Sequence, residues 1–265
     1  MARPLRIHSP GAFYHVLARG NERRKIFRDA LDCEHFLDLL GEMSERFGME
    51  VWAYVLMGNH YHLIVRPGER PLSGAMQWLG VAYSVWHNRR HRRSGHLYEG
   101  RFKAFAVEEE DYLERLICYI HRNPVRARLV KRLADYPWSS YAALGYARKC
   151  PDWLARDAVL RLYGGRGDRF RQAVESYSEE KRTLWADLRH GVFLGSESGF
   201  ARLWRRAQPA AHREIPESRS AGPRESVEAG VARWSQELGI SESERGKLLR
   251  PLRGRVRHDH AVPLA

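Results

Sequence analysis

The segment Gly58-Asn59-His60-Tyr61-His62-Leu63-Ile64-Val65 decides the fold of this part of the chain, because it joins a turn to an apolar strand. The Gly-Asn pair is a hairpin-turn signal, and it follows another apolar run at residues 51–57. Alternate residues of a strand share a face, with their Cα atoms about 6.6–7 Å apart. We therefore expect His60 and His62 to point to one side of a buried strand, close to its turn.

Two imidazoles at this separation can bind one metal ion, which is the first interpretation of the pair. The second is that both are hydrogen-bonded packing residues, which is the commoner role of a histidine on an apolar strand. The motif alone does not separate the two interpretations, but a second segment of the sequence favours the metal.

This second segment, residues 111–124, has the pattern of a helix. The acidic residues 108–111 suit the positive end of a helix dipole, and Pro124 requires the helix to end at or near Asn123. A spacing of four places Tyr119 and Asn123 on one stripe of the helix, at the edge of its apolar face. That apolar face consists of Leu113, Leu116, Ile117 and Ile120.

The polar side chains of this helix also have interpretations that need no function. An isolated tyrosine at the edge of a core usually serves packing, and its hydroxyl bonds a carbonyl group. An asparagine before a proline is an ordinary helix end. His121 lies two residues from Tyr119 and therefore roughly on the opposite side of the helix, so we interpret it as a packing or DNA-contact residue.

Taken together, the two segments resemble the single-tyrosine HUH transposases, and most of all the REP-associated tyrosine transposases. The resemblance covers roughly residues 8–145, with its motifs in order and at fitting intervals. These motifs are His15-Val16-Leu17-Ala18-Arg19-Gly20-Asn21, Gly58-Asn59-His60-Tyr61-His62, Gly100-Arg101-Phe102-Lys103, the run from Tyr119 to Ala127, and Tyr136-Pro137-Trp138-Ser139-Ser140.

The resemblance implies a role for each matching residue. His60 and His62 would be metal ligands, Tyr119 the nucleophile and Asn123 a third protein ligand, for which His121 is the neighbouring alternative. Two imidazoles and an amide oxygen suit Mg²⁺ or Mn²⁺ in an open site, whereas zinc would favour a closed one. The implied activity is that of a transposase, which cleaves and rejoins single-stranded DNA at hairpin (REP-like) sequences. A 5′-phosphotyrosine intermediate would keep the energy of the broken bond.

Three other functions use similar residues. Plasmid relaxases share the chemistry, but in many of them the tyrosine precedes the histidine motif, whereas here it follows. The order of motifs does not separate rolling-circle replication initiators, and only the wider motif match argues against them. A noncatalytic nucleic-acid-binding regulator derived from a transposase would keep its basic surface without turnover, so metal-dependent cleavage distinguishes it.

The charge of the chain predicts a nucleic-acid partner. The formal net charge is +13 and the pI is near 10, and much of the positive charge comes from arginine, whose planar fork matches phosphate. The densest basic run is at residues 87–96, and a second follows the first predicted strand. Although such runs are often only solvated surface, these flank the motifs above. We therefore predict DNA contacts from Arg19, Arg23, Arg24, Lys25, Arg89, Arg90, Arg92, Arg93, Arg101 and Lys103.

The remaining composition indicates the cellular setting. Cys33, Cys118 and Cys150 are odd in number and lack metal-ligand spacing, which is typical of a reducing cytosol. No apolar run approaches the length of a membrane span, and residues 1–5 contain no signal-peptide core. We expect a cytoplasmic protein without a membrane partner. The resemblance implies no single oligomeric state, and a homodimer is one alternative.

Strands alternate with helices in the first 145 residues, which predicts an α+β fold with an antiparallel sheet. The resemblance implies a ferredoxin-like palm with the histidine pair on a central strand and the tyrosine helix packed nearby. We expect strands at 12–19, 51–66 (a hairpin) and 102–107, and helices at 31–47, 73–88 and 111–123.

The composition changes after Gly145, which predicts further segments. We assign 1–145 to the catalytic domain, 146–207 to a mainly helical extension, 208–224 to a linker rich in Pro, Ser, Ala and Arg, and 225–265 to a short helical basic tail. The expected helices of the extension are at 155–163, 169–180 and 200–206, with an apolar insert at 191–195. The tail is either an incomplete helix-turn-helix module or a plain basic segment.

Overall fold

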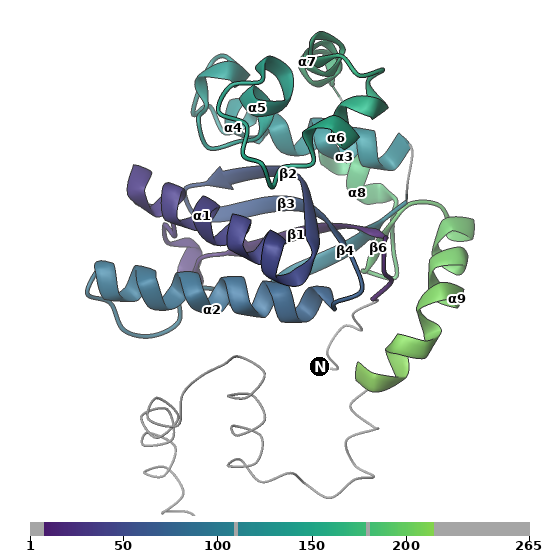
Figure 1. The fold of residues 1–265 in the computed structure, drawn as a ribbon, viewed down its shortest axis with the longest axis horizontal. Helices are drawn as coiled ribbons and strands as arrows, with labels where there is room; N and C mark the ends of the chain where they lie inside the picture. Colours follow the sequence, from purple (N-terminus) through teal and green to yellow (C-terminus); the bar gives the residue numbers. More distant parts are fainter. Residues whose placement is uncertain (1–7, 109–110, 179–180, 215–265) are drawn as a thin grey trace, which may run out of the picture. The chain divides into compact units, whose positions relative to one another are not determined.

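The computed structural model describes residues 8–108, 111–178 and 181–214 (Figure 1). The first part contains β1 (Phe13–Arg19), α1 (Ala30–Phe47), β2 (Met49–Met57), β3 (His60–Pro67), α2 (Leu72–Arg90), β4 (Lys103–Val107), α3 (Asp111–His121) and α4 (Asn123–Arg126). The later elements are α5 (Tyr141–Tyr146), α6 (Arg156–Leu162), α7 (Gly167–Ser176), α8 (Lys181–Ala186), β5 (Leu188–Arg189), β6 (Phe193–Leu194) and α9 (Glu197–Glu214), with 3₁₀ turns at Asn21–Arg23 and Leu133–Asp135.

The first four strands form a ferredoxin-like sheet. Their order along the chain is β1-α1-β2-β3-α2-β4, and their order in the sheet is β2-β3-β1-β4, with every neighbouring pair antiparallel. This confirms the predicted α+β fold and places β3, with both histidines, between two partners in the sheet. The hairpin turn is at Gly58-Asn59, as predicted, and Met57 faces His60 across it.

Helices α1 and α2 cover one face of the sheet (Figure 1). Phe36 of α1 packs on Tyr61 of β3 and on Tyr83 of α2, with ring centroids about 5 Å apart in both contacts. The side chain of Asp29 caps the start of α1, and Gly48 ends it in the left-handed conformation that glycine adopts without strain. Because neighbouring residues of a strand alternate, His60 and His62 must face the side opposite Tyr61.

Helix α3 packs against strand β2 of the sheet. Its predicted apolar face is buried at all four positions, Leu113, Leu116, Ile117 and Ile120. His121, which ends the helix, is also buried: one ring nitrogen contacts the carbonyl of Ile117 and the other contacts the hydroxyl of Ser140. Of the two roles expected for His121, the structure therefore supports packing and contradicts DNA contact.

The edge of the sheet at β2 is covered by the segment that follows α4. The amide of Leu56 donates to the carbonyl of Trp138, and Ser140 bonds both backbone groups of Tyr54. Pairing of this kind satisfies the backbone N–H and C=O groups through which an exposed edge strand could pair with another chain. The Tyr136-to-Ser140 motif therefore serves as a structural cover for the sheet.

The extension adds two strands to the other edge. The short strand β6 pairs with β4 in parallel, and β5 pairs with β6, so the complete sheet has six strands and is mixed. The apolar insert at 191–195 was expected between helices and is in fact largely this strand and its turn. The carboxylate of Glu108 accepts bonds from the Ser196 amide and hydroxyl and pairs with Arg202, which fastens the start of α9 beside β4.

Two differences from the predicted boundaries concern helix ends. Helix α3 ends at His121, so Asn123 begins α4 instead of ending the tyrosine helix, and Pro124 lies in the first turn of α4, where its missing N–H costs nothing. Helix α9 continues to Glu214, so residues 208–214 of the predicted linker are helical. The rest of that linker and the predicted basic tail at 225–265 lie outside the described residues. Among the described residues, no helix has both the length and the hydropathy needed to cross a membrane.

Candidate active site

Four predicted site residues line one cavity of about 450 Å³ on the histidine face of the sheet. His60 and His62 come from β3, Tyr119 from α3 and Asn123 from α4. The rest of the lining is Leu17, Arg19, Met57, Lys103, Phe105, Arg126, Ala127 and Trp185. Residues that are up to 63 positions apart in the sequence thus converge on a space large enough for a phosphate and its neighbours.

Both rings of the histidine pair are oriented by contacts at Nδ1. His60 Nδ1 lies 2.7 Å from the side-chain oxygen of Asn59, and His62 Nδ1 lies 2.9 Å from Nε2 of His15. The ring centroids of His60 and His62 are 5.0 Å apart and the rings are nearly perpendicular. Because these contacts involve Nδ1, the Nε2 atoms are the ones suited to hold an ion.

His15 is the most deeply placed residue of this group. Its side chain is fully buried on β1, its ring stacks on that of His62, and its Nδ1 contacts no partner among the described residues. Burial lowers the pKa of His15 to about 3, so the ring is neutral. A neutral His15 can accept a hydrogen bond at Nε2 from the Nδ1–H of His62, which is the tautomer of His62 that leaves Nε2 for a metal.

Tyr119 lies across from the histidine pair. Its ring is nearly perpendicular to that of His62, with centroids 6.5 Å apart, and the guanidinium of Arg126 lies 4.9 Å from the ring centre. The indole N–H of Trp185 points to the Tyr119 hydroxyl at 3.5 Å, a long hydrogen bond. The Tyr119 side chain is therefore held by contacts with His62, Arg126 and Trp185 at the lining of the cavity.

Asn123 brings an amide to the same cavity. Its Nδ2 is buried and contacts no hydrogen-bond partner among the described residues. The two ends of an amide are distinguished only by their partners, so the orphaned end is equally an oxygen position. A buried amide without a partner is costly unless something else satisfies it.

These observations fit a bound divalent ion. Two imidazoles turned to present Nε2 and one orphaned amide form a neutral donor set, which suits a cation that retains water and binds phosphate oxygens. The residues that would hold the ion are His60, His62 and Asn123, the three metal ligands predicted from the sequence.

The predicted DNA-contact residues fall into separate groups. Arg19 and Lys103 line the cavity, and Arg101 lines a different groove beside α2. Among the others, Arg24 forms an exposed ion pair with Glu22. None of Arg23, Lys25, Arg89, Arg92 and Arg93 lines the catalytic cavity, and their contact with DNA stays a prediction.

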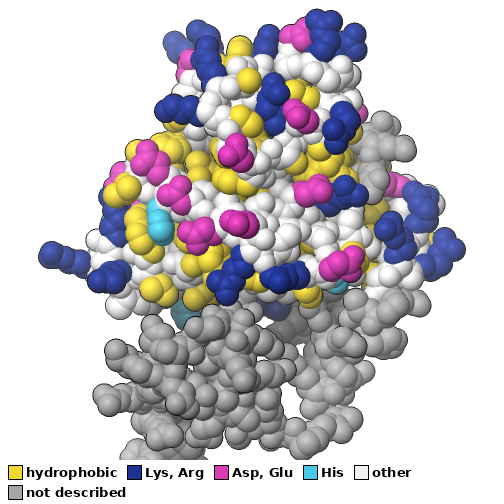
Figure 2. Space-filling view, in the orientation of Figure 1, with side chains coloured by type: hydrophobic (Ala, Val, Ile, Leu, Met, Phe, Trp, Pro, Cys, Tyr) yellow, Lys and Arg dark blue, Asp and Glu magenta, His cyan; other side chains and the backbone are white. Residues whose placement is uncertain are grey.

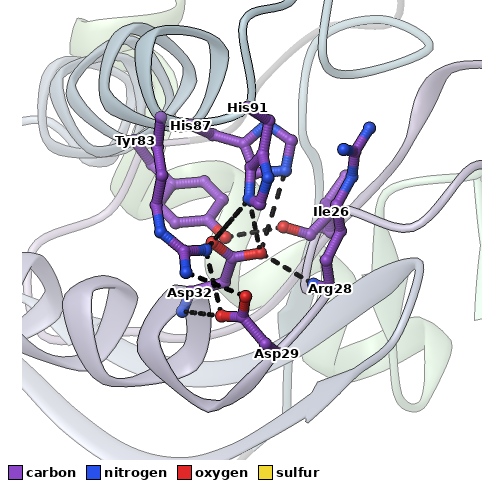
Figure 3. Close-up of polar contacts among 8 residues, drawn as sticks. Ile26, Arg28, Asp29, Asp32, Tyr83, His87 and His91 are labelled. Carbon is purple, nitrogen blue, oxygen red and sulfur yellow. Dashed lines mark hydrogen bonds and ion pairs between the residues drawn. The ribbon is translucent and has the colours of Figure 1, made fainter.

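Arg90 belongs to a partly buried network between α1 and α2, of which Figure 3 labels Asp29, Asp32, His87 and His91. Its guanidinium pairs with Asp29 and with Asp32, whose carboxylate is completely buried. Asp32 also accepts from the Arg28 amide and contacts His91. The structure therefore gives Arg90 a role in joining the two helices, which the sequence alone did not indicate.

The same network contains the side chains of Asp32, His87 and His91, whose potential ligand atoms lie within 4.8 Å of one another. Such a trio can hold a metal ion in principle. Here, however, the Arg90 guanidinium already compensates the single carboxylate, and it lies 3.1 Å from the His91 Nε2 that a metal would need. A divalent metal ion bound here in addition to the guanidinium would leave the group with excess positive charge. We therefore interpret Asp32, His87 and His91 as part of an ion-pair network.

Among the residues at the site that were not predicted as site residues, His15, Phe105, Arg126 and Trp185 are the ones with charged or aromatic side chains. His15 and Arg126 lie within motifs of the resemblance, and their proximity to those motifs was the available signal. Phe105 lies in a predicted strand, and the alternating pattern of a strand predicts that a side chain is buried but not that it lines a cavity. Trp185 comes from the extension, where nothing local to the sequence points to Tyr119.

The chain was compared with known protein families, curated sequences and solved structures. Residues 9–123 match the family described as "Transposase IS200 like", a range that includes the histidine pair, Tyr119 and Asn123. Over residues 9–123 the chain is therefore similar to the IS200-like transposases. No curated protein sequence matches the chain closely enough to count as a relative.

Solved structures with a similar arrangement include transposases. The chain is similar to a REP-associated tyrosine transposase bound to a REP hairpin, with 18% identity and a TM-score of 0.48 over 57% of this chain and 88% of that one. It is also similar to a putative transposase from Deinococcus radiodurans, with 15% identity and a TM-score of 0.33 over 49% and 91% of the two chains. A third similar structure is the tRNA(His) guanylyltransferase of Saccharomyces cerevisiae, with 8% identity and a TM-score of 0.34 over 68% and 86%.

Proposed function

We propose that this transposase cleaves and rejoins single-stranded DNA at hairpin-forming, REP-like sequences, through a covalent bond between Tyr119 and a 5′-phosphate. The observation that carries the proposal is the convergence of Tyr119, His60, His62 and Asn123 on one cavity with basic residues at its wall. A phenol oxygen, a site for a cation and positive charge near the phosphate are the groups that such a transfer requires.

In the proposed reaction the Tyr119 oxygen attacks the scissile phosphorus and the bond from phosphorus to the 3′-oxygen breaks. The phenol proton is lost and the leaving 3′-oxygen gains one, so protons balance. Arg19, Lys103 and Arg126 would attract the phosphate to the cavity. A bound Mg²⁺ or Mn²⁺ would supply a counter-charge for the phosphate oxygens. Because the phosphotyrosine keeps the energy of the broken bond, a later 3′-hydroxyl can reverse the reaction and join strands.

The test is the covalent adduct. Full-length protein incubated with a labelled single-stranded hairpin oligonucleotide and Mg²⁺ or Mn²⁺ should form a protein–DNA adduct on Tyr119 and release a free 3′-hydroxyl, as resolved by mass spectrometry and denaturing gels. Tyr119→Phe keeps the ring and its packing, so it should bind the hairpin and form no adduct. Tyr112→Phe is the matched control, because Tyr112 lies on the same helix but not in the cavity.

His60→Ala and His62→Ala extend this test to the metal. Both should lose cleavage while they retain most hairpin binding, since binding rests on cations and not on these rings. Asn123→Ala should be milder, because water can replace one neutral ligand. An adduct on Tyr112, or cleavage by Tyr119→Phe, would overturn the proposal. Hairpin binding by the wild type without any cleavage would instead indicate a noncatalytic regulator.

A further inference from the structure

The wall of the catalytic cavity beside Tyr119 is aromatic. Trp185 of α8 and Phe105 of β4 are both only partly buried, and their rings meet edge to face with centroids 5.1 Å apart. Trp185 also approaches Tyr119 and His15. Large aromatic side chains that remain accessible in a polar cavity offer their faces to a flat ligand.

The extension holds Trp185 firmly in this position. Leu184, its neighbour on α8, is completely buried, and Asp187 next to the helix pairs with Arg115 of α3 at 3.9 Å. The parallel pairing of β6 with β4 attaches the following hairpin to the catalytic sheet. Trp185 is therefore fixed from two sides, although it lies outside the residues that match the transposase family.

The cavity has room for more than an ion and a phosphate. An ion with three waters fills roughly 100 Å³, because each water takes about 30 Å³ in the liquid. The cavity is about 450 Å³, so most of its volume is left for a nucleotide. Its lining also includes the cations Arg19, Lys103 and Arg126. Aromatic faces beside cations are the combination that binds single-stranded nucleic acid, through stacking of bases and attraction of phosphates.

We propose that Trp185 and Phe105 form a stacking subsite for the nucleobase on the 3′ side of the scissile phosphate, an inference that rests on the proposed function. The side follows from the direction of attack. The Trp185 indole lies beside the Tyr119 hydroxyl, and in-line transfer sends the leaving 3′-oxygen away from that hydroxyl. The nucleotide that stays joined to Tyr119 is therefore the one nearer the indole.

A binding cycle tests this subsite without any need for cleavage. Full-length protein carrying Tyr119→Phe is titrated with hairpin oligonucleotides that have either a base or an abasic sugar at the position 3′ to the scissile phosphate. Trp185→Ala should weaken binding of the complete oligonucleotide by about 5- to 100-fold, the range expected for loss of one base stack. The abasic oligonucleotide should bind both proteins equally weakly, because the stack is then already lost.

Three comparisons make the result specific. Trp185→Phe should keep most of the affinity, since it retains an aromatic ring, whereas Trp185→Leu should behave as the alanine variant does. Trp204→Ala alters a partly buried tryptophan of α9 that does not line the cavity. In this variant the abasic sugar should weaken binding by the same factor as in the protein with Trp204. An abasic sugar 5′ to the phosphate should not be coupled to Trp185.

If Trp185→Ala and the abasic sugar each weakened binding and their fold losses of affinity multiplied, the two changes would be independent and the subsite would be overturned. Full affinity in Trp185→Leu would overturn it as well. If the wild type failed to cleave but the coupling were present, the proposed transposition chemistry would fail and the stacking subsite would stand.

Discussion

His15 is a fully buried residue whose ring contacts a proposed metal ligand, His62. It occupies the Nδ1 side of His62, and burial keeps it neutral, so it can act as the acceptor that fixes one tautomer. Partners of this kind hold metal ligands in orientation and raise their basicity. The interaction deepens the metal proposal and gives a test of it that does not depend on the nucleophile.

We expect His15→Ala to raise the Mn²⁺ concentration needed for half-maximal cleavage by about 10- to 100-fold, the usual effect of losing such a partner. Cleavage at saturating Mn²⁺ should largely recover, because the ligands and Tyr119 are intact. His15→Gln offers an amide oxygen as acceptor and should restore part of the metal affinity. Titration of cleavage against Mn²⁺ measures both effects. An unchanged half-saturation in His15→Ala would show that the contact has only a packing role.

The site residues differ in how far the sequence could predict them. The period of two in the strand and the spacing of four in the helix placed His60, His62 and Tyr119 on the correct faces, because those spacings are local. The partner of His62 depends on the register between β1 and β3, in which Leu17 and not His15 lies directly opposite His62. No local pattern carries that register, and so His15 was recognisable only as part of a motif.

Helix α2 runs from Leu72 to Arg90, close to the predicted range of 73–88, but the end of the helix has a role that was not predicted. The basic run that begins there was interpreted as a DNA contact, whereas the last turns of α2 face a buried carboxylate on α1 (Figure 3). Asp32 carries a charge that sequence reasoning would assign to the surface, because it lies in the first turn of a helix. The tertiary contact between α1 and α2 gives Asp32 and Arg90 a shared structural role, and only a three-dimensional structure reveals such a contact.

His87 makes this network sensitive to acid. Its side chain is completely buried, and neither ring nitrogen makes a hydrogen bond among the described residues, although Nε2 lies 4.0 Å from a carboxylate oxygen of Asp32. Burial, and next the charge of His91, lower its pKa to about 4, below the value of about 6.5 for an unfolded chain. Between these two values the unfolded chain binds more protons, so the folded state loses stability as pH falls from about 6.5 to about 4.

We therefore expect His87→Phe to remove part of this acid sensitivity. The histidine can account for at most about 3 kcal/mol of the free energy of unfolding over this window. Urea unfolding at pH 8 compares packing alone, since His87 is neutral in both states there. Between pH 8 and pH 5, the free energy of unfolding should fall less in the variant than in the wild type. Parallel losses in both proteins between pH 8 and pH 5 would contradict the assignment.

In the molecule as a whole, a stripe of acidic side chains lies on the face of the sheet that α1 and α2 cover. Helix α1 exposes Glu34, Asp38, Glu42 and Glu45 along this stripe, and Figure 2 shows Asp and Glu side chains on this face with Lys and Arg side chains around them. The cavity on the opposite face is lined by Arg19, Lys103 and Arg126 and by no acidic residue. A net charge of +13 thus includes an acidic stripe turned away from the proposed DNA site, which favours approach of DNA from the cavity side.

The predicted boundary at Gly145 separates segments that the structure joins. Helix α7 packs on α3 and α5, where Phe170 and Val174 are completely buried, and Arg122 of the catalytic part donates to the carbonyls of Val174 and Glu175. Composition does not register long-range pairing such as that of the two-residue strand β6, which is too short to have a pattern of its own.

We expect a chain truncated after Gly145 to be unstable and inactive. The truncation exposes the free edge of β4, removes Trp185 from the cavity and uncovers the side chains of α3 and α5 on which α7 packs. Each large apolar side chain that loses its burial costs about 1.5–3 kcal/mol, so several together approach the whole stability of a typical domain.

A chain ending at Ile215 is the matched control, because the compact unit that contains the cavity ends there. It should retain the cooperative unfolding transition of the full protein and form the Tyr119 adduct with hairpin DNA. Circular dichroism during urea unfolding and the adduct assay compare the three chains. A fragment of residues 1–145 that unfolded as cooperatively as the full chain and formed the adduct at a similar rate would show that the extension contributes neither stability nor an aromatic wall to the site.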